Sequence, residues 1–195
     1  KDPAKSGREQ QNYLIRVKYG KLTDNLTNGI KISVPEATGA IAFYKKSHLI
    51  IKVKSRNGYL TFMMGKILIN EKGTAGRFDT LWTFYVKNTT GFSRGQDIYY
   101  DAQTDCLFIP QCNNANNVNK IMVVNLSGES ETYKGNKLYT PQDIITVDKQ
   151  KDYSKYEIES LVIAPKRHIV MVANIVPKGT KTADDAVERI SNLKF

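Results

Sequence analysis

The 195-residue sequence lacks several patterns, and each absence excludes a class of protein. No stretch approaches the roughly 18 uninterrupted apolar residues that a membrane helix needs. No Gly-x-Ser-x-Gly elbow, phosphate-binding loop, dinucleotide glycine fingerprint or His-Glu-x-x-His motif is present. Residues 1–11 are polar and have no apolar run behind them, so no signal peptide is present in this chain, although one could have been removed. We expect residues 1–11 to form a disordered or flexible arm.

Cysteine is scarce, which limits disulfides and metal sites. The two cysteines, Cys106 and Cys112, are separated by five residues. On one extended strand they would lie about 20 Å apart, too far for a disulfide without an intervening bend or bulge. Metal sites commonly use four ligands in closely spaced pairs, a pattern that is missing here. The sequence therefore favours two free thiols over a disulfide, and either over a metal site. We expect no metal and no cofactor.

Positive charge is abundant. Lysine and arginine total 29 against 19 acidic residues, which gives a net charge of +10 and a pI near 9.5. This charge is compatible with nucleic acid, anionic glycans or a negatively charged cell envelope as partners. The basic residues are scattered and do not form one block with stacking aromatics. A solvated basic surface is thus favoured over a dedicated anion site.

Short apolar runs bounded by Gly, Asn, Asp or Lys-rich turns recur along the whole chain and predict about a dozen strands. An all-β sandwich, barrel, propeller or solenoid follows from this pattern. Only Thr182–Leu193 competes as a helix, with Thr182 as cap and Asp185 at the capping-box position. The stretch could instead be a strand, but we expect the helix.

Internal repeats distinguish among these architectures. Three segments read as an apolar strand, a polar turn and a stronger apolar strand: Ile41–Ile51, Ile98–Ile109 and Leu161–Met171. Their first residues are 57 and 63 positions apart (41 to 98, then 98 to 161). A third strand type recurs at Gly65–Asn70 and Asn119–Asn125. The repeat unit is thus a four-stranded meander, which buries both faces only by stacking on copies of itself.

The second unit carries a family resemblance. Asp97–Asp101, followed by Leu107–Ile109 and then Asn119–Asn125, resembles blades of β-propellers of the YVTN/NHL class. The resemblance implies a propeller with degenerate blades, possibly partial, and the alternative is a β-sandwich or barrel. It divides a single β domain, residues 12–195, into four successive parts. These are a half blade at 12–38, blades at 39–90 and 95–150, and a half blade at 157–195.

The incomplete blades lead to a prediction about the chain's two ends. We expect Tyr13–Val17 and Ile30–Val34 to complete the sheet begun by Leu161–Val172. Without such closure the propeller would need a partner or self-association to cover its apolar faces.

Two histidines and a cysteine share one position of the repeat. His48, Cys106 and His168 all lie close to the start of the second hairpin strand. They are the residue types of a zinc triad, but equivalent positions in successive blades lie far apart. Equivalent packing in each blade is the favoured interpretation.

The resemblance also implies where a ligand would bind, because propellers bind ligands on loops over the central channel. The loops expected there are Thr90–Asp97, Tyr153–Ser160 and Pro35–Gly39. An arginine with nearby acids and aromatics suits polar or sugar-like ligands. The candidate ligand-binding residues are Phe92, Arg94, Gln96, Asp97, Tyr156, Glu157 and Glu159.

We therefore expect a non-catalytic ligand-binding or protein-interaction propeller module that is exported to the cell surface or extracellular space. The sequence leans against an enzyme, since no catalytic motif is visible. One alternative is a glycan-active hydrolase or lyase with its site in the propeller channel, because propeller enzymes need no linear motif. The other is polyanion or nucleic-acid binding through the net charge. A glycan, a polyanion or another protein is the expected partner.

Overall fold

The computed structural model is an all-β structure, which confirms the predicted fold class. It describes residues 13–16, 30–35, 37–45, 47–56, 58–92, 95, 97–113, 118–147, 152–164 and 168–190. These residues form fifteen strands and no helix. None of the described segments could cross a membrane as a helix.

The first sheet is built on an antiparallel meander of four consecutive strands. They are β3 (Thr38–Tyr44), β4 (His48–Arg56), β5 (Tyr59–Ile69) and β6 (Ala75–Lys87). The hairpin of β1 (Tyr13–Arg16) and β2 (Ile30–Ser33) extends this sheet, because β2 pairs in parallel with the start of β6.

The second and third sheets are also antiparallel meanders. The second contains β7 (Tyr99–Asp101), β8 (Cys106–Asn113), β9 (Val118–Asn125) and β12 (Asp143–Val147). The third contains β13 (Tyr153–Ala164), β14 (His168–Pro177) and β15 (Asp184–Ile190).

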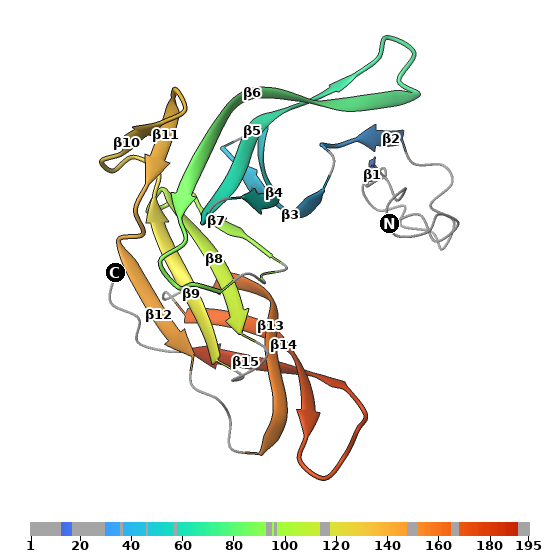
Figure 1. Cartoon of the computed structure of the whole chain (residues 1–195). Coiled ribbons are helices and arrows are strands. Elements are labelled where there is room, and N and C mark those ends of the chain that lie inside the picture. The colour runs from blue at the N-terminus through green and yellow to red at the C-terminus, as the bar shows by residue number, and fades with distance from the viewer. Residues whose placement is uncertain are drawn as a thin grey trace.

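A small hairpin connects the first two sheets. It consists of β10 (Glu131–Tyr133) and β11 (Asn136–Tyr139), inserted in the sequence between β9 and β12. The hairpin leaves the second sheet, and β11 pairs in parallel with the end of β6, with Lys137 opposite Phe84. Figure 1 shows it standing against β6, away from the third sheet.

The three sheets stack face to face around two hydrophobic cores. Leu107 and Ile109 on β8 pack into the core shared with the first sheet. Cys106 and Phe108 on the same strand pack into the core shared with the third sheet. The second sheet is therefore buried on both faces, which explains the unbroken apolar run Ile121–Val124 in β9.

A β-bulge bends the long β5–β6 hairpin. The register shifts between Met64 and Gly65, where Met64 pairs with Trp82 and Gly65 pairs with Thr80. A Cβ on Gly65 would lie 2.1 Å from the carbonyl oxygen of Asp79, so only glycine allows this approach. Beyond the bulge the hairpin projects as the arm seen at the top of Figure 1.

The local sequence predictions hold where they concern hairpins. Each of the three predicted hairpins is present, as β3–β4, β7–β8 and β13–β14. The prediction of two thiols outside a disulfide is confirmed: Cys106 and Cys112 are both buried on the same strand, and neither is bonded to another cysteine. The predicted arm at residues 1–11 lies outside the described residues.

Three predictions are wrong. The helix predicted at Thr182–Leu193 is not formed by Asp184–Ile190, which pairs with β14 as a strand. The free energy gained from sheet pairing outweighs helix propensity there. Tyr153–Ser160 is part of β13 and not a channel loop. The chain's ends do not pair, since β1 and β2 join the free edge of β6 in the first sheet.

Candidate functional site

The structure offers two candidate sites, one inside the stack and one open to solvent. The first, which we call the interior polar cluster, contains two of the sequence-predicted residues. Its side chains come from all three sheets and from the connection before β7. The interior polar cluster consists of Lys52, Asp97, Gln111, Cys112, Asn119 and Glu157.

Side chains of the second sheet hold the backbone of β13 in the third sheet. Asn119 is fully buried, and its Nδ2 donates to the carbonyl oxygen of Tyr156 at 2.9 Å. Its Oδ1 accepts from the backbone N–H of Ile158 at 3.0 Å. Asp97, just before β7, accepts from the N–H of Leu161 at 3.1 Å. These bonds satisfy β13 backbone groups that would otherwise be buried without partners.

The charged groups of the cluster lie where water is largely excluded. The Sγ of Cys112 donates to Oε1 of Glu157 at 3.2 Å, and Lys155 lies 3.2 Å from Oε2. Lys52 donates to the carbonyl oxygen of Gly95 at 2.9 Å. Burial lowers the pKa of Lys52 to about 8, against the opposing effects of Cys112 and Asp97. Burial likewise raises the pKa of Asp97, although backbone hydrogen bonds act against this rise.

This packing leaves no open space for a ligand at Gly95. A Cβ there would lie 2.2 Å from the carbonyl oxygen of Pro110 and 2.6 Å from Nε2 of Gln111. Gln111 Nε2 donates to Pro110, whereas its Oε1 has no partner within the described part of the chain. The interior polar cluster therefore joins the sheets, and its hydrogen bonds are made mainly within the protein.

The other sequence-predicted residues are dispersed. Phe92 lies under the ammonium group of Lys120, 5.2 Å from the ring centroid. The hydroxyl of Tyr156 donates to Glu188 at 2.6 Å. Glu159 is half-buried on β13. Arg94 and Gln96 lie outside the described residues. Ligand binding by this set stays a prediction.

The His-Cys-His set is separated by the stacking of the sheets. His48 begins β4, Cys106 begins β8 and His168 begins β14, so each residue belongs to a different sheet. Among the described residues, no three His, Cys, Asp or Glu side chains are close enough to hold a metal ion.

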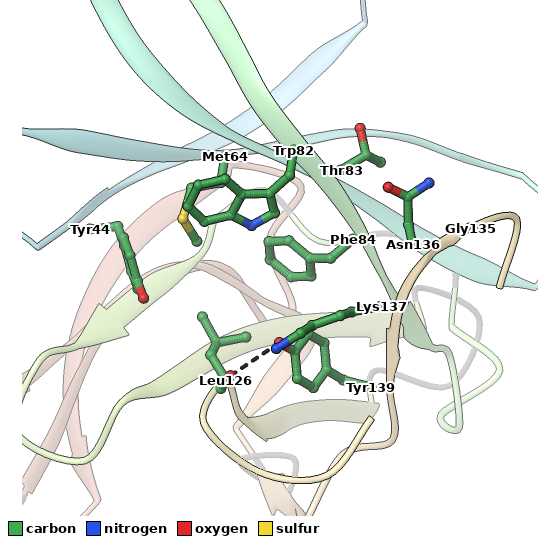
Figure 2. Close-up of a pocket in the computed structure, with 10 residues that line it drawn as sticks. All are labelled: Tyr44, Met64, Trp82, Thr83, Phe84, Leu126, Gly135, Asn136, Lys137 and Tyr139. Atoms are coloured by element: carbon green, nitrogen blue, oxygen red, sulfur yellow. Dashed lines mark hydrogen bonds between the residues drawn. The ribbon is translucent and has the colours of Figure 1, made fainter. Parts of the chain in front are cut away.

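The second candidate site, which we call the aromatic pocket, is open and has a volume of about 440 Å³. It lies between the first sheet and the β10–β11 hairpin, beside the turn that follows β9 (Figure 2). Its lining residues are Tyr44, Met64, Trp82, Thr83, Phe84, Leu126, Gly135, Asn136, Lys137 and Tyr139.

Four of the ten lining residues are aromatic. Trp82, the single tryptophan of the sequence, keeps 45% of its surface exposed, whereas Phe84 is buried beneath it. Phe84 stacks on Phe62 with centroids 5.0 Å apart, and Tyr139 meets it edge-on at 5.7 Å. Figure 2 shows the Trp82 indole and the Tyr44 ring on one side of the space, with Lys137 and Tyr139 across from them. A buried aromatic floor thus supports an exposed indole.

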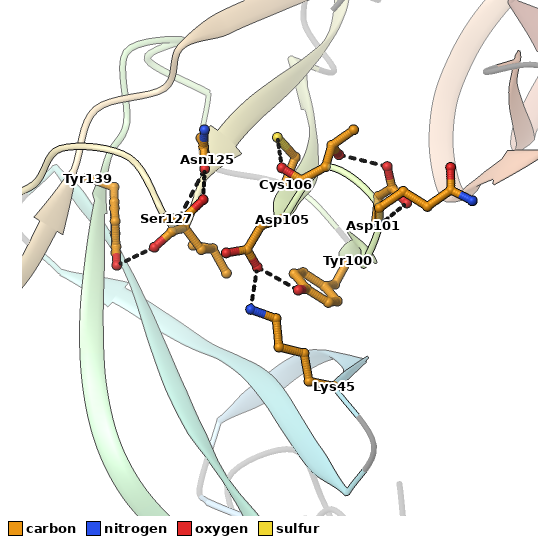
Figure 3. Close-up of polar contacts among 11 residues, drawn as sticks. Lys45, Tyr100, Asp101, Asp105, Cys106, Asn125, Ser127 and Tyr139 are labelled. Atoms are coloured by element: carbon orange, nitrogen blue, oxygen red, sulfur yellow. Dashed lines mark hydrogen bonds and ion pairs between the residues drawn. The ribbon is translucent and has the colours of Figure 1, made fainter.

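A hydrogen-bonded network fixes the turn beside the pocket (Figure 3). The Tyr139 hydroxyl donates to the carbonyl oxygen of Leu126 at 3.0 Å, and the N–H of Leu126 donates to the carbonyl oxygen of Asp105 at 2.9 Å. The Asp105 carboxylate pairs with Lys45 at 3.0 Å and accepts from the hydroxyl of Tyr100. Burial alone would raise the pKa of Asp105, but these two partners lower it.

The polar side chains in the pocket lining, apart from the tyrosines, are those of Thr83, Asn136 and Lys137. Lys134 and Gly135 have φ of 51° and 72°, the left-handed conformation of a two-residue hairpin turn. This turn positions Asn136, whose Nδ2 donates to the carbonyl oxygen of Lys134 at 3.0 Å and leaves Oδ1 as an acceptor. Thr83 alternates with Trp82 on β6 and Asn136 alternates with Lys137 on β11, and Figure 2 shows both directed away from Tyr139. The pocket therefore combines aromatic rings with the ammonium group of Lys137.

Sequence reasoning missed this pocket. Its residues extend from Tyr44 to Tyr139 and meet only because β11 crosses to β6. The one local signal was Trp82, a lone tryptophan in a predicted strand. Comparisons with protein-family models, with curated proteins and with solved structures give no match to this chain.

Proposed function

We propose that this chain is an exported, non-catalytic module of propeller-type blades that binds a saccharide in the aromatic pocket. The observation that carries the proposal is the exposed Trp82, which lines the pocket together with three other aromatic rings and the ammonium group of Lys137. Exposed indole and phenol rings stack on the C–H faces of sugar rings, while amides, hydroxyls and ammonium groups bond their hydroxyls.

The stacking of the meanders supports propeller-type blades. The first strands β3 and β7 contact each other, and β13 contacts β7 as well as its neighbours β8 and β9. The two successive interfaces each bury a continuous apolar core. Convergence of first strands with face-to-face sheets is the arrangement of neighbouring blades.

The composition of the pocket favours binding over catalysis. Glycoside hydrolysis usually needs a pair of carboxyl groups flanking the scissile bond. The residues that line the pocket include no aspartate, glutamate or histidine. The half-buried Asp97 and the buried Glu157 belong to the interior polar cluster and bond to the protein. We therefore prefer a binding module to the glycan-active hydrolase or lyase alternative.

The test is a glycan array followed by calorimetry on the best oligosaccharide. Trp82→Ala should weaken binding about tenfold or more, since it removes the stacking surface. Leu81→Ala is the matched control because Leu81 is equally exposed, at 46%, but does not line the pocket. Absence of any saccharide binding, or equal loss in both variants, would contradict the proposal. Turnover of a bound oligosaccharide would contradict its non-catalytic part.

A further inference from the structure

The aromatic pocket has a one-sided charge. Lys137 is the single charged residue in its lining, and no acidic residue accompanies it. A neutral sugar needs no cation, and burying one beside it gains little. The positive charge of the lining therefore bears on whether the ligand is neutral or acidic.

Two other lysines near the pocket form ion pairs with acidic residues. Lys45 pairs with Asp105, and Lys87 pairs with Glu131. The Lys137 ammonium has no carboxylate within ion-pair distance among the described residues. It lies 5.8 Å from the centroid of the Tyr139 ring, and Figure 2 shows it on the pocket side of β11. The Lys137 side chain is thus exposed to solvent at the edge of the pocket.

We infer that the saccharide carries a carboxylate, as a uronic acid does, and that Lys137 pairs with it while Trp82 stacks on a sugar ring. This inference rests on the proposed function and names its ligand class. A single ammonium matches a single carboxylate, whereas a multiply sulfated sugar would need several cations. The net charge of +10 also attracts an acidic saccharide to the surface.

The test compares trisaccharides of galacturonic, glucuronic and mannuronic acid, each as the free acid and as the methyl ester. The ester keeps the ring and removes the charge. At least one free acid should bind about tenfold more tightly than its ester, as expected for a hydrogen bond to a charged group. Raising sodium chloride from 50 to 500 mM should weaken binding of the free acid and spare the ester.

Two variants assign the effect to one side chain. Lys137→Gln should abolish the preference for the free acid, so that the free acid and its ester bind the variant alike. Lys134→Gln is the matched control, because Lys134 belongs to the same hairpin but lies outside the pocket, over the Tyr133 ring. Equal effects of the two variants would mean that diffuse charge attracts the ligand, and would overturn the inference.

The inference and the proposed function fail in different ways. If free acids and esters bind alike and both lose affinity in Trp82→Ala, the inference is wrong and the proposed function stands. If no trisaccharide, acidic or neutral, binds in a manner that depends on Trp82, both are wrong.

Discussion

The interior polar cluster and the aromatic pocket both combine an amide, a lysine and aromatic neighbours, but they differ in what those groups bond to. In the cluster, Asn119 and Asp97 bond to the backbone of β13, and Lys52 bonds to Gly95. In the pocket, Lys137 has no carboxylate partner among the described residues. Polar groups that bond within the protein stabilise it, whereas available polar groups can bind a ligand.

The largest expected difference between the two sites is the effect of Asn119 on stability. Asn119→Ala should lower the free energy of unfolding by about 3 kcal/mol, because two buried backbone groups of β13 lose their partners. Urea denaturation measures the change. Asn136→Ala, which alters the same chemical group in the pocket, is the control and should cost less than about 1 kcal/mol. Equal losses would mean that the cluster does not hold the sheets together.

The pH dependence of stability is the second test. The pKa of Lys52 is about 8 in the folded chain, below the ordinary value of 10.5. The unfolded chain therefore binds the proton more tightly between these values, so stability rises with pH over this window. The rise attributable to Lys52 should be on the order of 2 kcal/mol by about pH 9.5.

Comparison of the wild-type chain with Lys52→Met isolates this contribution. Urea denaturation at several pH values between about 7.5 and 9.5 avoids the tyrosines, whose raised pKa values act above that window. The variant should show a flatter profile. Parallel profiles would contradict the assignment of the lowered pKa to burial of Lys52.

The smallest expected effect on stability and binding is at Tyr133, where the β10–β11 hairpin packs on the first sheet. The Tyr133 ring packs on Tyr59 and Tyr85, with centroids 4.5 and 5.0 Å away. Tyr133→Ala should lower stability by about 1 kcal/mol and weaken saccharide binding about threefold, because the pocket wall loosens. Tyr133→Phe keeps the rings and should change neither quantity. Calorimetry would refute this account if affinity stayed constant in the alanine variant.

Local pattern was sufficient to predict the hairpins but not the way in which they associate. The segments Ile41–Ile51 and Ile98–Ile109 each contain both strands and the turn, so the sequence alone specifies the pairing. β2 and β11 pair in parallel with the edge of β6 that β5 leaves free. Local sequence pattern does not show which strand has a free edge. Thr182–Leu193 was predicted as a helix because its apolar residues fit one helical face, whereas Asp184–Ile190 pairs with the preceding strand β14.

The candidate sites, like the sheets, depend on non-local contacts that local sequence pattern does not predict. Asp97 and Glu157 were singled out because they lie in the segments expected as loops over a propeller channel, and the structure brings both into one cluster. Their expected position on open loops was wrong for Glu157, which lies within β13. The pocket around Trp82 was not predictable, because its walls come from the first meander and from the hairpin inserted in the second.

The pairing of β11 with β6 has a consequence for the order of folding. Phe84 and Lys137 are register partners 53 positions apart (137 − 84), so this contact is non-local and closes a long loop. The first meander can form its own hairpins early. Its strand β6, however, pairs with β11 only after the second meander has been synthesised and has docked. Because β11 forms one wall of the pocket, the pocket is complete only when the two sheets have docked. Ligand binding therefore indicates correct docking. A ligand that binds there stabilises the docked chain over every partly folded form.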